Sequence, residues 1–388
     1  MAAASPTSCP LYASGVFPPD VTLAVVELLN HSITGGATLQ YTQMYSLGLV
    51  SRFWLAATRP YCFQVMELSD DNAVSFVDLV ASPHCTLSYC STTLFIRDTG
   101  LKSTDWLTEA LTLPNTAFSF VKELSFAVSG DWAPVSSTVM ENLPLVFSGV
   151  VDLVPPTSIN DEVTPENLVS FVSSFPALQR LQLYSYYQYG SDPSSVSDPA
   201  PFRHARNYQP PPYLRDIYYS SSSDPFVGEG ILSWLSSSAQ PSLLESFYVY
   251  SYGARCLPLE NTLRVSAGSL LRVTMAVSQV ILQALSSHVD WAAFAELQYL
   301  DLHFSPATPD DMQALIRILT SLRDLPHLHW LSLQDVGSDP ARLDAVFNEP
   351  SFSVLEELTI ITKPKDHESI LPICRGRGFL SFRSTGYY

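Results

Sequence analysis

The chain has 388 residues, of which 46% are hydrophobic and 15% are charged. This composition provides enough apolar side chains for an extended core and excludes global disorder. The formal net charge of −17 repels phosphate groups, which argues against binding of nucleic acid or of an anionic membrane surface.

Signals for export or for a membrane are also missing from the sequence. The six cysteines have no spacing typical of a disulfide framework, which favours small buried thiols in a reducing compartment. No basic segment precedes an apolar run at the N-terminus, so we expect no signal peptide. No apolar run reaches the length of about 18 residues that crosses a bilayer. We therefore expect a cytoplasmic or nuclear protein with no membrane partner.

The first part of the chain is predicted to be a tail followed by a helix. Residues 1–16 are rich in Ala, Ser and Pro and are expected to be a disordered tail. A helix is predicted after Phe17-Pro18-Pro19-Asp20, because proline is tolerated at a helix start and Asp20 can cap it. The apolar face of this helix has helical spacing and comprises Val21, Val25, Leu28 and Leu29.

A second helix is predicted over residues 46–59, after a loop at residues 30–43 that contains a pair of glycines. Leu47, Val50 and Trp54 fall on one face of this helix, and Pro60 is expected to end it. From the residues alone, the two helices are expected to cap the hydrophobic end of a repeat array.

This helical segment resembles an F-box. That family begins with Leu-Pro-x-Glu, continues with an Ile- and Leu-rich helix and ends with Leu-x-Leu-Val-Cys/Ser-Arg-x-Trp. The corresponding runs here are Phe17-Pro18-Pro19-Asp20, Val25-Val26-Glu27-Leu28-Leu29 and Leu47-Gly48-Leu49-Val50-Ser51-Arg52-Phe53-Trp54. The resemblance implies an F-box-like helical module at residues 17–66 that docks a Skp-type adaptor of a cullin-RING ligase. The expected adaptor-binding residues are those that match the motif, namely Pro18, Pro19, Val25, Leu28, Leu49, Val50 and Trp54.

Residues 60–388 carry a recurring L-x-x-L-x-L pattern, which is clearest at 297–302, 328–333 and 355–360. Successive motifs lie 26 to 36 residues apart, which is typical of long leucine-rich repeats with one strand and one helix each. The central apolar residues, used as anchors, are Met66, Leu94, Leu124, Val151, Leu181, Ile217, Phe247, Val273, Leu300, Leu331 and Leu358. We predict an α/β, leucine-rich-repeat-like solenoid of about eleven units, with parallel strands on its concave face and helices on its convex face.

The helical halves of the units have apolar residues at three- and four-residue spacing, and several start at a Thr-Pro or Asp-Pro pair. Their predicted spans are 72–81, 105–113, 165–174, 229–237, 280–294, 309–322 and 340–347. The longest interval predicts a loop at 185–213, which is either a plain surface loop or one that reaches over the concave face to touch a ligand.

The two parts together resemble the F-box/leucine-rich-repeat proteins. The resemblance implies a non-enzymatic substrate receptor of an SCF-type ubiquitin ligase, whose repeats capture a protein substrate. The alternative is a leucine-rich-repeat interaction scaffold that has no link to a ubiquitin ligase.

In L-x-x-L-x-L the leucines face the core, so the residues beside and between the last two face the concave side. Tyrosine, tryptophan and arginine at such positions are typical of binding hot spots, although aromatic residues also pair across strands for stability. The expected partner-binding residues are Gln182, Tyr184, Tyr218, Tyr248, Tyr250, Tyr299, Asp301, His303, Trp330 and Gln334. Equivalent positions hold Arg180, Asp216, Arg272, Thr274 and Ser332.

A hydrolase that uses Asp301, His303 and Ser332 is the enzymatic alternative. A relay of this kind needs the histidine between the other two residues and an oxyanion hole, whereas Ser332 is expected beside the acid on an open sheet. His84-Cys85 with Cys90 lacks a fourth metal ligand at suitable spacing, and no nucleotide-binding motif is complete. We expect no catalytic residues, no metal and no cofactor.

Overall fold

The computed structural model describes residues 24–26, 46–49, 52–83, 85, 87, 92–96, 105–114, 116–126, 137–155, 165–185, 208–221, 226–237, 243–251, 257–304, 308–323, 325–334, 340–348, 352, 354–362, 371–376 and 378–384. The expected tail at 1–16 lies outside these residues, as does most of the expected loop at 185–213.

A single parallel sheet of 12 strands runs through the described part of the chain, and the strands follow one another in space in sequence order. Parallel neighbours need a crossover connection between them, which the intervening helices provide. The strands are β1 (Val65–Leu68), β2 (Thr92–Ile96), β3 (Val121–Phe126), β4 (Asp152–Val154), β5 (Arg180–Ser185), β6 (Asp216–Ser221), β7 (Ser246–Ser251), β8 (Arg272–Val277), β9 (Tyr299–His303), β10 (Trp330–Leu333), β11 (Glu357–Thr362) and β12 (Leu380–Ser384). The α/β class and the parallel repeats compatible with a solenoid are therefore confirmed.

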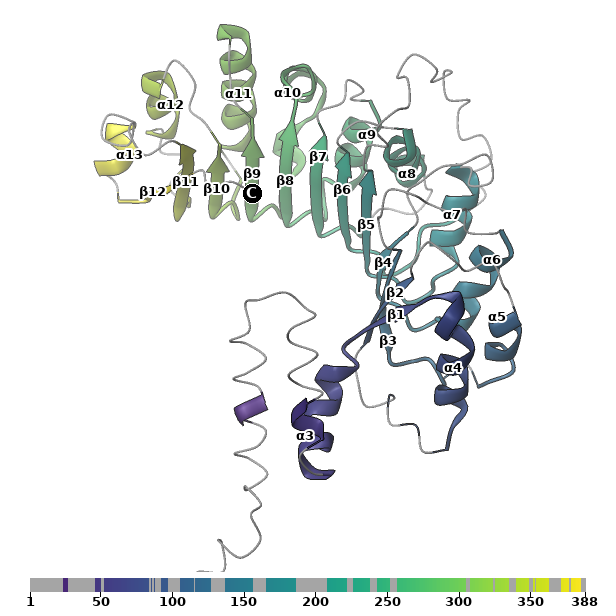
Figure 1. Cartoon of the computed structure of the whole chain (residues 1–388). Helices are drawn as coiled ribbons and strands as arrows, with labels where there is room; N and C mark the ends of the chain where they lie inside the picture. Colours follow the sequence, from purple (N-terminus) through teal and green to yellow (C-terminus); the bar gives the residue numbers. More distant parts are fainter. Residues whose placement is uncertain are drawn as a thin grey trace, which may run out of the picture.

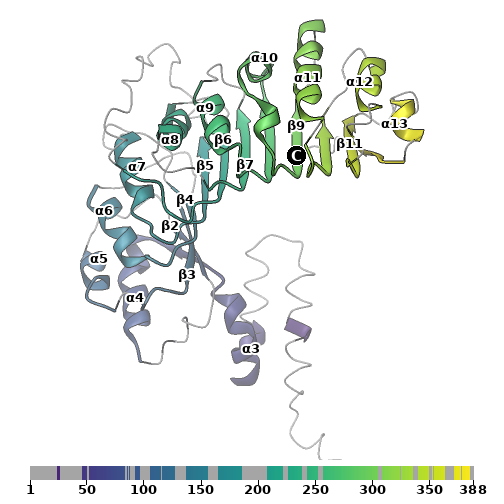
Figure 2. The same ribbon diagram turned by 180° about the vertical axis from the view of Figure 1, so that it is seen from behind.

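The crossover helices cover one side of the sheet. Figure 1 shows the sheet curved into an arc, with the strands on its inner side and the helices on its outer side, and Figure 2 shows the same arrangement from behind. The outer helices are α4 (Asp70–Ala81), α5 (Asp105–Ala110), α6 (Ser137–Val146), α7 (Pro165–Ser173), α8 (Phe226–Ser237), α9 (Leu257–Ser266), α10 (Gln279–His288), α11 (Pro309–Leu322), α12 (Pro340–Phe347) and α13 (Pro372–Gly376). The inner side of the arc is called the concave face below.

The register of the strands aligns every predicted anchor but one. Met66 pairs with Leu94 at one end of the series, and Leu331 pairs with Leu358 at the other. The wrong anchor is Val151, because Leu153 is the residue aligned with Leu124 and Leu181. The segment 150–154 is apolar at nearly every position, so alternation alone leaves its register open.

The array contains one strand more than the eleven units that were predicted. Strand β12 aligns Leu380 with Leu358, at a shorter interval than any between the predicted anchors. Helices α6, α9 and α13 were not predicted either. Pro144 lies inside α6 and Pro258 inside the first turn of α9, and proline within a segment argues against a helix in sequence-based reasoning.

The helices predicted from a Thr-Pro or Asp-Pro start begin where expected, whereas α4, α8 and α10 begin one to three residues earlier than predicted. Helices α7, α11 and α12 begin at the expected prolines. At α11 the Thr308 hydroxyl accepts a hydrogen bond from the Asp311 amide at 3.2 Å, and the Asp311 carboxylate accepts one from the Thr308 amide at 2.9 Å. The predicted helix 280–294 is instead α10 followed by the 3-10 turn η4 (Trp291–Ala293), since Asp290 caps a new turn at Ala292. Helix α5 ends at Ala110 rather than at residue 113.

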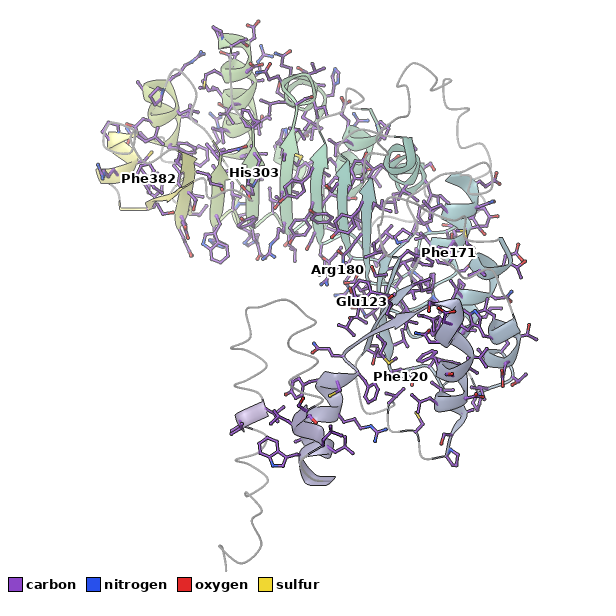
Figure 3. All side chains as sticks on the ribbon, in the orientation of Figure 1. Phe120, Glu123, Phe171, Arg180, His303 and Phe382 are labelled. Carbon is purple, nitrogen blue, oxygen red and sulfur yellow. The ribbon has the colours of Figure 1, made fainter. Side chains whose placement is uncertain are left out.

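The hydrophobic core lies between the sheet and the outer helices and is continuous from Leu68 to Cys374. Aromatic side chains fill much of it, and several meet edge to face, as Phe171 does with Phe175 at a centroid distance of 5.1 Å. Figure 3 labels Phe171 in this layer. Each unit buries its apolar side against the next unit, so the array is stabilised by stacking.

The predicted N-terminal module is described only in part. Residues 24–26 are helical, residues 46–48 form a helical turn, and α3 (Arg52–Cys62) leads into β1. Helix α3 continues two residues past Pro60, so the predicted end at that proline is wrong, because a proline in the last turn removes only one backbone hydrogen bond near the helix end. Figure 1 shows α3 apart from the row of outer helices. Within the described ranges, no helix has the length and apolar character needed to cross a membrane.

Candidate functional site

The concave face carries three rows of side chains, because in-register parallel strands place equivalent residues side by side. The first row contains Asp152, Arg180, Asp216, Ser246, Arg272, Tyr299 and Trp330. The second contains Gln182, Tyr218, Tyr248, Thr274, Asp301 and Ser332. The third contains Tyr184, Ser220, Tyr250, Ala276 and His303. Gln334 lies one residue beyond β10, where its amide donates to the Leu302 carbonyl at 3.0 Å. The expected partner-binding residues therefore share one face.

Four half-buried tyrosines from three neighbouring strands form a cluster near the middle of this face. Tyr218 is at its centre, with ring-centroid distances of 5.1 Å to Tyr184, 5.6 Å to Tyr250 and 6.3 Å to Tyr248. These four residues are called the tyrosine cluster below. The rings contact one another across strands, which stabilises the sheet, and they also leave partly exposed aromatic surface for a ligand.

Arg272 extends the aromatic surface towards the C-terminal repeats. Its guanidinium donates a hydrogen bond to the Tyr248 hydroxyl at 3.2 Å and lies 5.3 Å from the centre of the Tyr299 ring. The hydrogen bond to Tyr248 is the main cause that raises the pKa of Arg272. Tyr299 in turn meets the edge of Trp330, which is 45% exposed. This part of the face already holds a cation against an aromatic ring.

Asp301 and His303 contact each other beside the tyrosine cluster. His303 Nε2 lies 2.8 Å from Asp301 Oδ2, and the His303 ring is 6.2 Å from that of Tyr250. Asp301 is only 8% exposed, and its Oδ1 atom has no hydrogen-bond partner among the described residues. Burial, with the nearby Tyr218 and Asp301, raises the pKa of Tyr250 to about 12, so its hydroxyl keeps its proton at neutral pH.

The register does not assemble a Ser-His-Asp relay. Ser332 is aligned with Asp301 on the neighbouring strand, so the serine adjoins the acid and not the histidine. A relay requires the histidine to accept the proton of the serine hydroxyl. The geometry at Asp301 and His303 therefore suits binding of a polar group better than acyl transfer.

A pocket of about 230 Å³ opens on the concave face over β2 to β6. Its charged lining includes Glu123, Asp152, Arg180 and Asp216. Arg180 lies between two acids, at 2.9 Å from Asp152 Oδ2 and 3.7 Å from Asp216 Oδ2. Figure 3 labels Glu123 and Arg180 on the inner side of the arc.

Hydrogen bonds connect this pocket to the tyrosine cluster. Gln182 Nε2 donates to Asp152 Oδ1 at 2.9 Å, and the Tyr184 hydroxyl donates to Gln182 Oε1 at 2.8 Å. The sequence-based choice of site residues omitted Glu123 and Asp152. Both occupy the same register position as Arg180. Glu123 could have been found from the correct anchor Leu124, whereas Asp152 could be found only with the correct alignment of β4.

Glu123 is the least compensated of these acids. It is half-buried, and Thr93 Oγ1 donates to its carboxylate at 2.9 Å. Burial raises its pKa above the ordinary value, and repulsion from Asp152 adds to the increase, although the Thr93 hydrogen bond and Arg180 act in the opposite direction. Ionised Glu123 therefore costs the folded protein some stability near neutral pH.

Glu123→Gln is accordingly expected to keep or slightly raise the melting temperature at neutral pH, since glutamine can still accept the Thr93 hydrogen bond. A raised pKa means that the folded state binds the proton more tightly than the unfolded state, so the penalty is present above the folded pKa and disappears below the unfolded one. The difference between variant and wild type should shrink as the pH falls through that window. Thermal melts at several pH values, with Glu141→Gln on the exposed surface of α6 as control, test this; a lower melting temperature for Glu123→Gln at neutral pH would contradict it.

The expected adaptor-binding residues are described only in part. Leu49 is 72% exposed, Val25 is also exposed, and Trp54 is half-buried. Pro18, Pro19, Leu28 and Val50 lie outside the described residues. Gly48 is buried, and a Cβ atom there would lie 3.1 Å from Thr58 Oγ1, so this glycine lets the turn at 46–48 approach α3 closely.

Two further results bear on the site. In the described ranges, no group of three or more His, Cys, Asp or Glu side chains is arranged to hold a metal ion. The chain matches no protein-family model, and no curated protein matches it either.

Proposed function

We propose that this protein is a receptor that captures a protein substrate on the concave face of leucine-rich-type repeats and presents it to a ubiquitin ligase. The F-box-like module at 17–66 would dock a Skp-type adaptor, and the array would hold the substrate. The observation that carries the proposal is the group of partly exposed side chains on the concave face that comprises the tyrosine cluster, Arg272, Tyr299 and Trp330.

The chemistry of that row supports recognition of a protein. Tyrosine and tryptophan bury a large area at a low cost in side-chain entropy, and with arginine they dominate binding hot spots. Trp330, the first residue of β10, is nearly half exposed. Such a side chain contributes little to the core and can contribute much to an interface.

The arrangement of the helical module supports an adaptor-binding role over a purely capping one. Among the side chains that the structure describes, the continuous core contains none from α3, and Phe63, just after this helix, packs partly against it. A cap would bury its apolar side chains against the end of the array. Leu49 and Val25 are instead exposed, as expected for residues that contact a partner.

Leu49→Asp combined with Val25→Asp is expected to weaken adaptor binding by at least about tenfold, because each change places a charge in an apolar contact. Both side chains are exposed, so the melting temperature should change little. The measurement is capture of a purified Skp-type adaptor by the full chain. Leu145→Asp, at an exposed leucine of α6, is the matched control and should bind the adaptor normally.

The alternative is an interaction scaffold without a ubiquitin ligase. This alternative holds if neither the wild type nor the control binds any Skp-type adaptor while the concave face still captures a protein. The proposed link to a ubiquitin ligase is then wrong.

A further inference from the structure

The pocket over β2 to β6 differs from the rest of the concave face in its charge. Three carboxylates, from Glu123, Asp152 and Asp216, line it together with the two cations Lys122 and Arg180. Asp152 and Asp216 share Arg180 between them. Glu123 accepts a hydrogen bond from Thr93 but forms no ion pair within the described residues, so its charge is less closely neutralised than those of Asp152 and Asp216.

A second carboxylate with unmet bonding capacity lies farther along the same face. Asp301 Oδ1 is buried and lacks a hydrogen-bond partner among the described residues, although its other oxygen contacts His303. Along the sheet, the tyrosine cluster on β5 to β7 lies between Glu123 on β3 and Asp301 on β9. Acidic groups therefore flank a partly exposed aromatic surface on both sides.

The distances suit a short extended peptide. From Glu123 on β3 to Asp301 on β9 there are six steps between neighbouring strands, which at about 4.8 Å each is roughly 29 Å. An extended chain covers roughly 3.3 Å per residue, so about nine residues would run from Glu123 to Asp301. Such a segment crosses the tyrosine cluster on its way.

We propose that the concave face binds a basic segment of a protein partner, with a lysine or arginine side chain in the pocket beside Glu123 and the next residues over the tyrosine cluster. This inference rests on the proposed receptor function and specifies the chemistry of its substrate. Aromatic faces attract cations, and Arg272 over Tyr299 shows the same contact within the chain. The net charge of −17 favours encounter with a basic partner.

An acidic or phosphorylated segment fits the same surface poorly. Arg180 is the first-row cation at the pocket, and it lies between Asp152 and Asp216. An incoming anion would have to compete with both of these carboxylates for the guanidinium, and it would also meet the charge of Glu123. A lysine or arginine side chain instead meets the Glu123 carboxylate, which accepts a hydrogen bond from Thr93 and forms no ion pair within the described residues.

The test measures fluorescence anisotropy of the full chain with a labelled peptide of alternating lysine and glycine, against a peptide of alternating glutamate and glycine. We expect the basic peptide to bind and the acidic one not to bind at equal ionic strength. Glu123→Gln should weaken binding of the basic peptide about tenfold, which corresponds to one lost charge-assisted contact. Glu141→Gln removes the same charge from the outer surface of α6 and should leave binding within about twofold.

Equal weakening by the two substitutions would show attraction to the overall charge and overturn the proposal, as would equal binding of the acidic peptide. If Glu123→Gln lowers the melting temperature, Asp216→Asn takes its place, because Arg180 keeps Asp152 as its partner in that variant. Adaptor capture is measured on the same preparations. If the wild type binds the adaptor but does not prefer the basic peptide, only the proposed basic substrate is wrong. If the wild type does not bind the adaptor at all, the proposed receptor function is wrong.

Discussion

Replacing Leu300 by alanine is expected to lower the free energy of unfolding by about 2–5 kcal/mol. Leu300 is 0% exposed in the middle of β9, where it is aligned with Val273 and Leu331. The substitution leaves a cavity in a close-packed core that the neighbouring strands can fill only in part. Because each repeat contacts mainly its neighbours, the loss should be largest around β9.

Chemical denaturation gives the total loss, and hydrogen exchange shows where the array opens first. Protection of amides in β8 to β10 should fall before protection in β2 and β3. Leu145→Ala makes the same chemical change at an exposed position of α6 and should alter stability by less than about 0.5 kcal/mol. Similar losses for the two variants would contradict the assignment of Leu300 to the continuous core.

The double replacement of Tyr248 and Trp330 by alanine is expected to weaken partner capture about 100-fold, because two hot-spot side chains are removed from one surface. Neither residue lies in the core. Replacing Tyr248 removes its contacts with Arg272 and Tyr218, and replacing Trp330 removes its contact with Tyr299. The melting temperature should therefore fall by only a few degrees. Quantitative affinity capture and thermal melts of the same preparations measure the two effects.

Tyr213→Ala is the control for this experiment. Tyr213 is exposed in the turn before β6 and lies outside the three rows of the concave face. Its replacement should leave partner capture unchanged. The opposite result would be a large fall in the melting temperature of the double variant, with partner capture reduced only as far as the amount of folded protein is reduced. That result would show that Tyr248 and Trp330 act in cross-strand packing and not in binding.

Repeat spacing predicted most of the strand positions, because the apolar residues at each strand centre have to face the helices. That requirement is local and repeats in every unit, so it is visible in the sequence. It failed at Val151, where neighbouring positions are also apolar, and at β12, which follows after a shorter interval. Helices α6 and α9 were not predicted, and each contains a proline near one end, where proline is tolerated: Pro144 in the last turn of α6 and Pro258 in the first turn of α9.

The same periodicity predicted which side chains share the concave face, since residues between two core leucines have to point the other way. It did not predict that Tyr218 would be the centre of a four-ring cluster. Nor did it predict that Arg272 would bridge Tyr248 and Tyr299. These contacts depend on the distance between strands and on side-chain rotamers, neither of which a single strand encodes.

The sequence by itself determined the alternation of strand and helix and the identity of the residues on the concave face. Only the tertiary structure decided that Glu123, Asp152 and Asp216 converge on one pocket around Arg180, and that Asp301 keeps one buried oxygen without a partner. The physical reason is that a strand's pattern is set by its own burial, whereas the register between strands is set by hydrogen bonds between residues far apart in the chain. One such bond joins the Val151 amide to the Lys122 carbonyl at 2.8 Å and brings Asp152 beside Glu123 and Arg180.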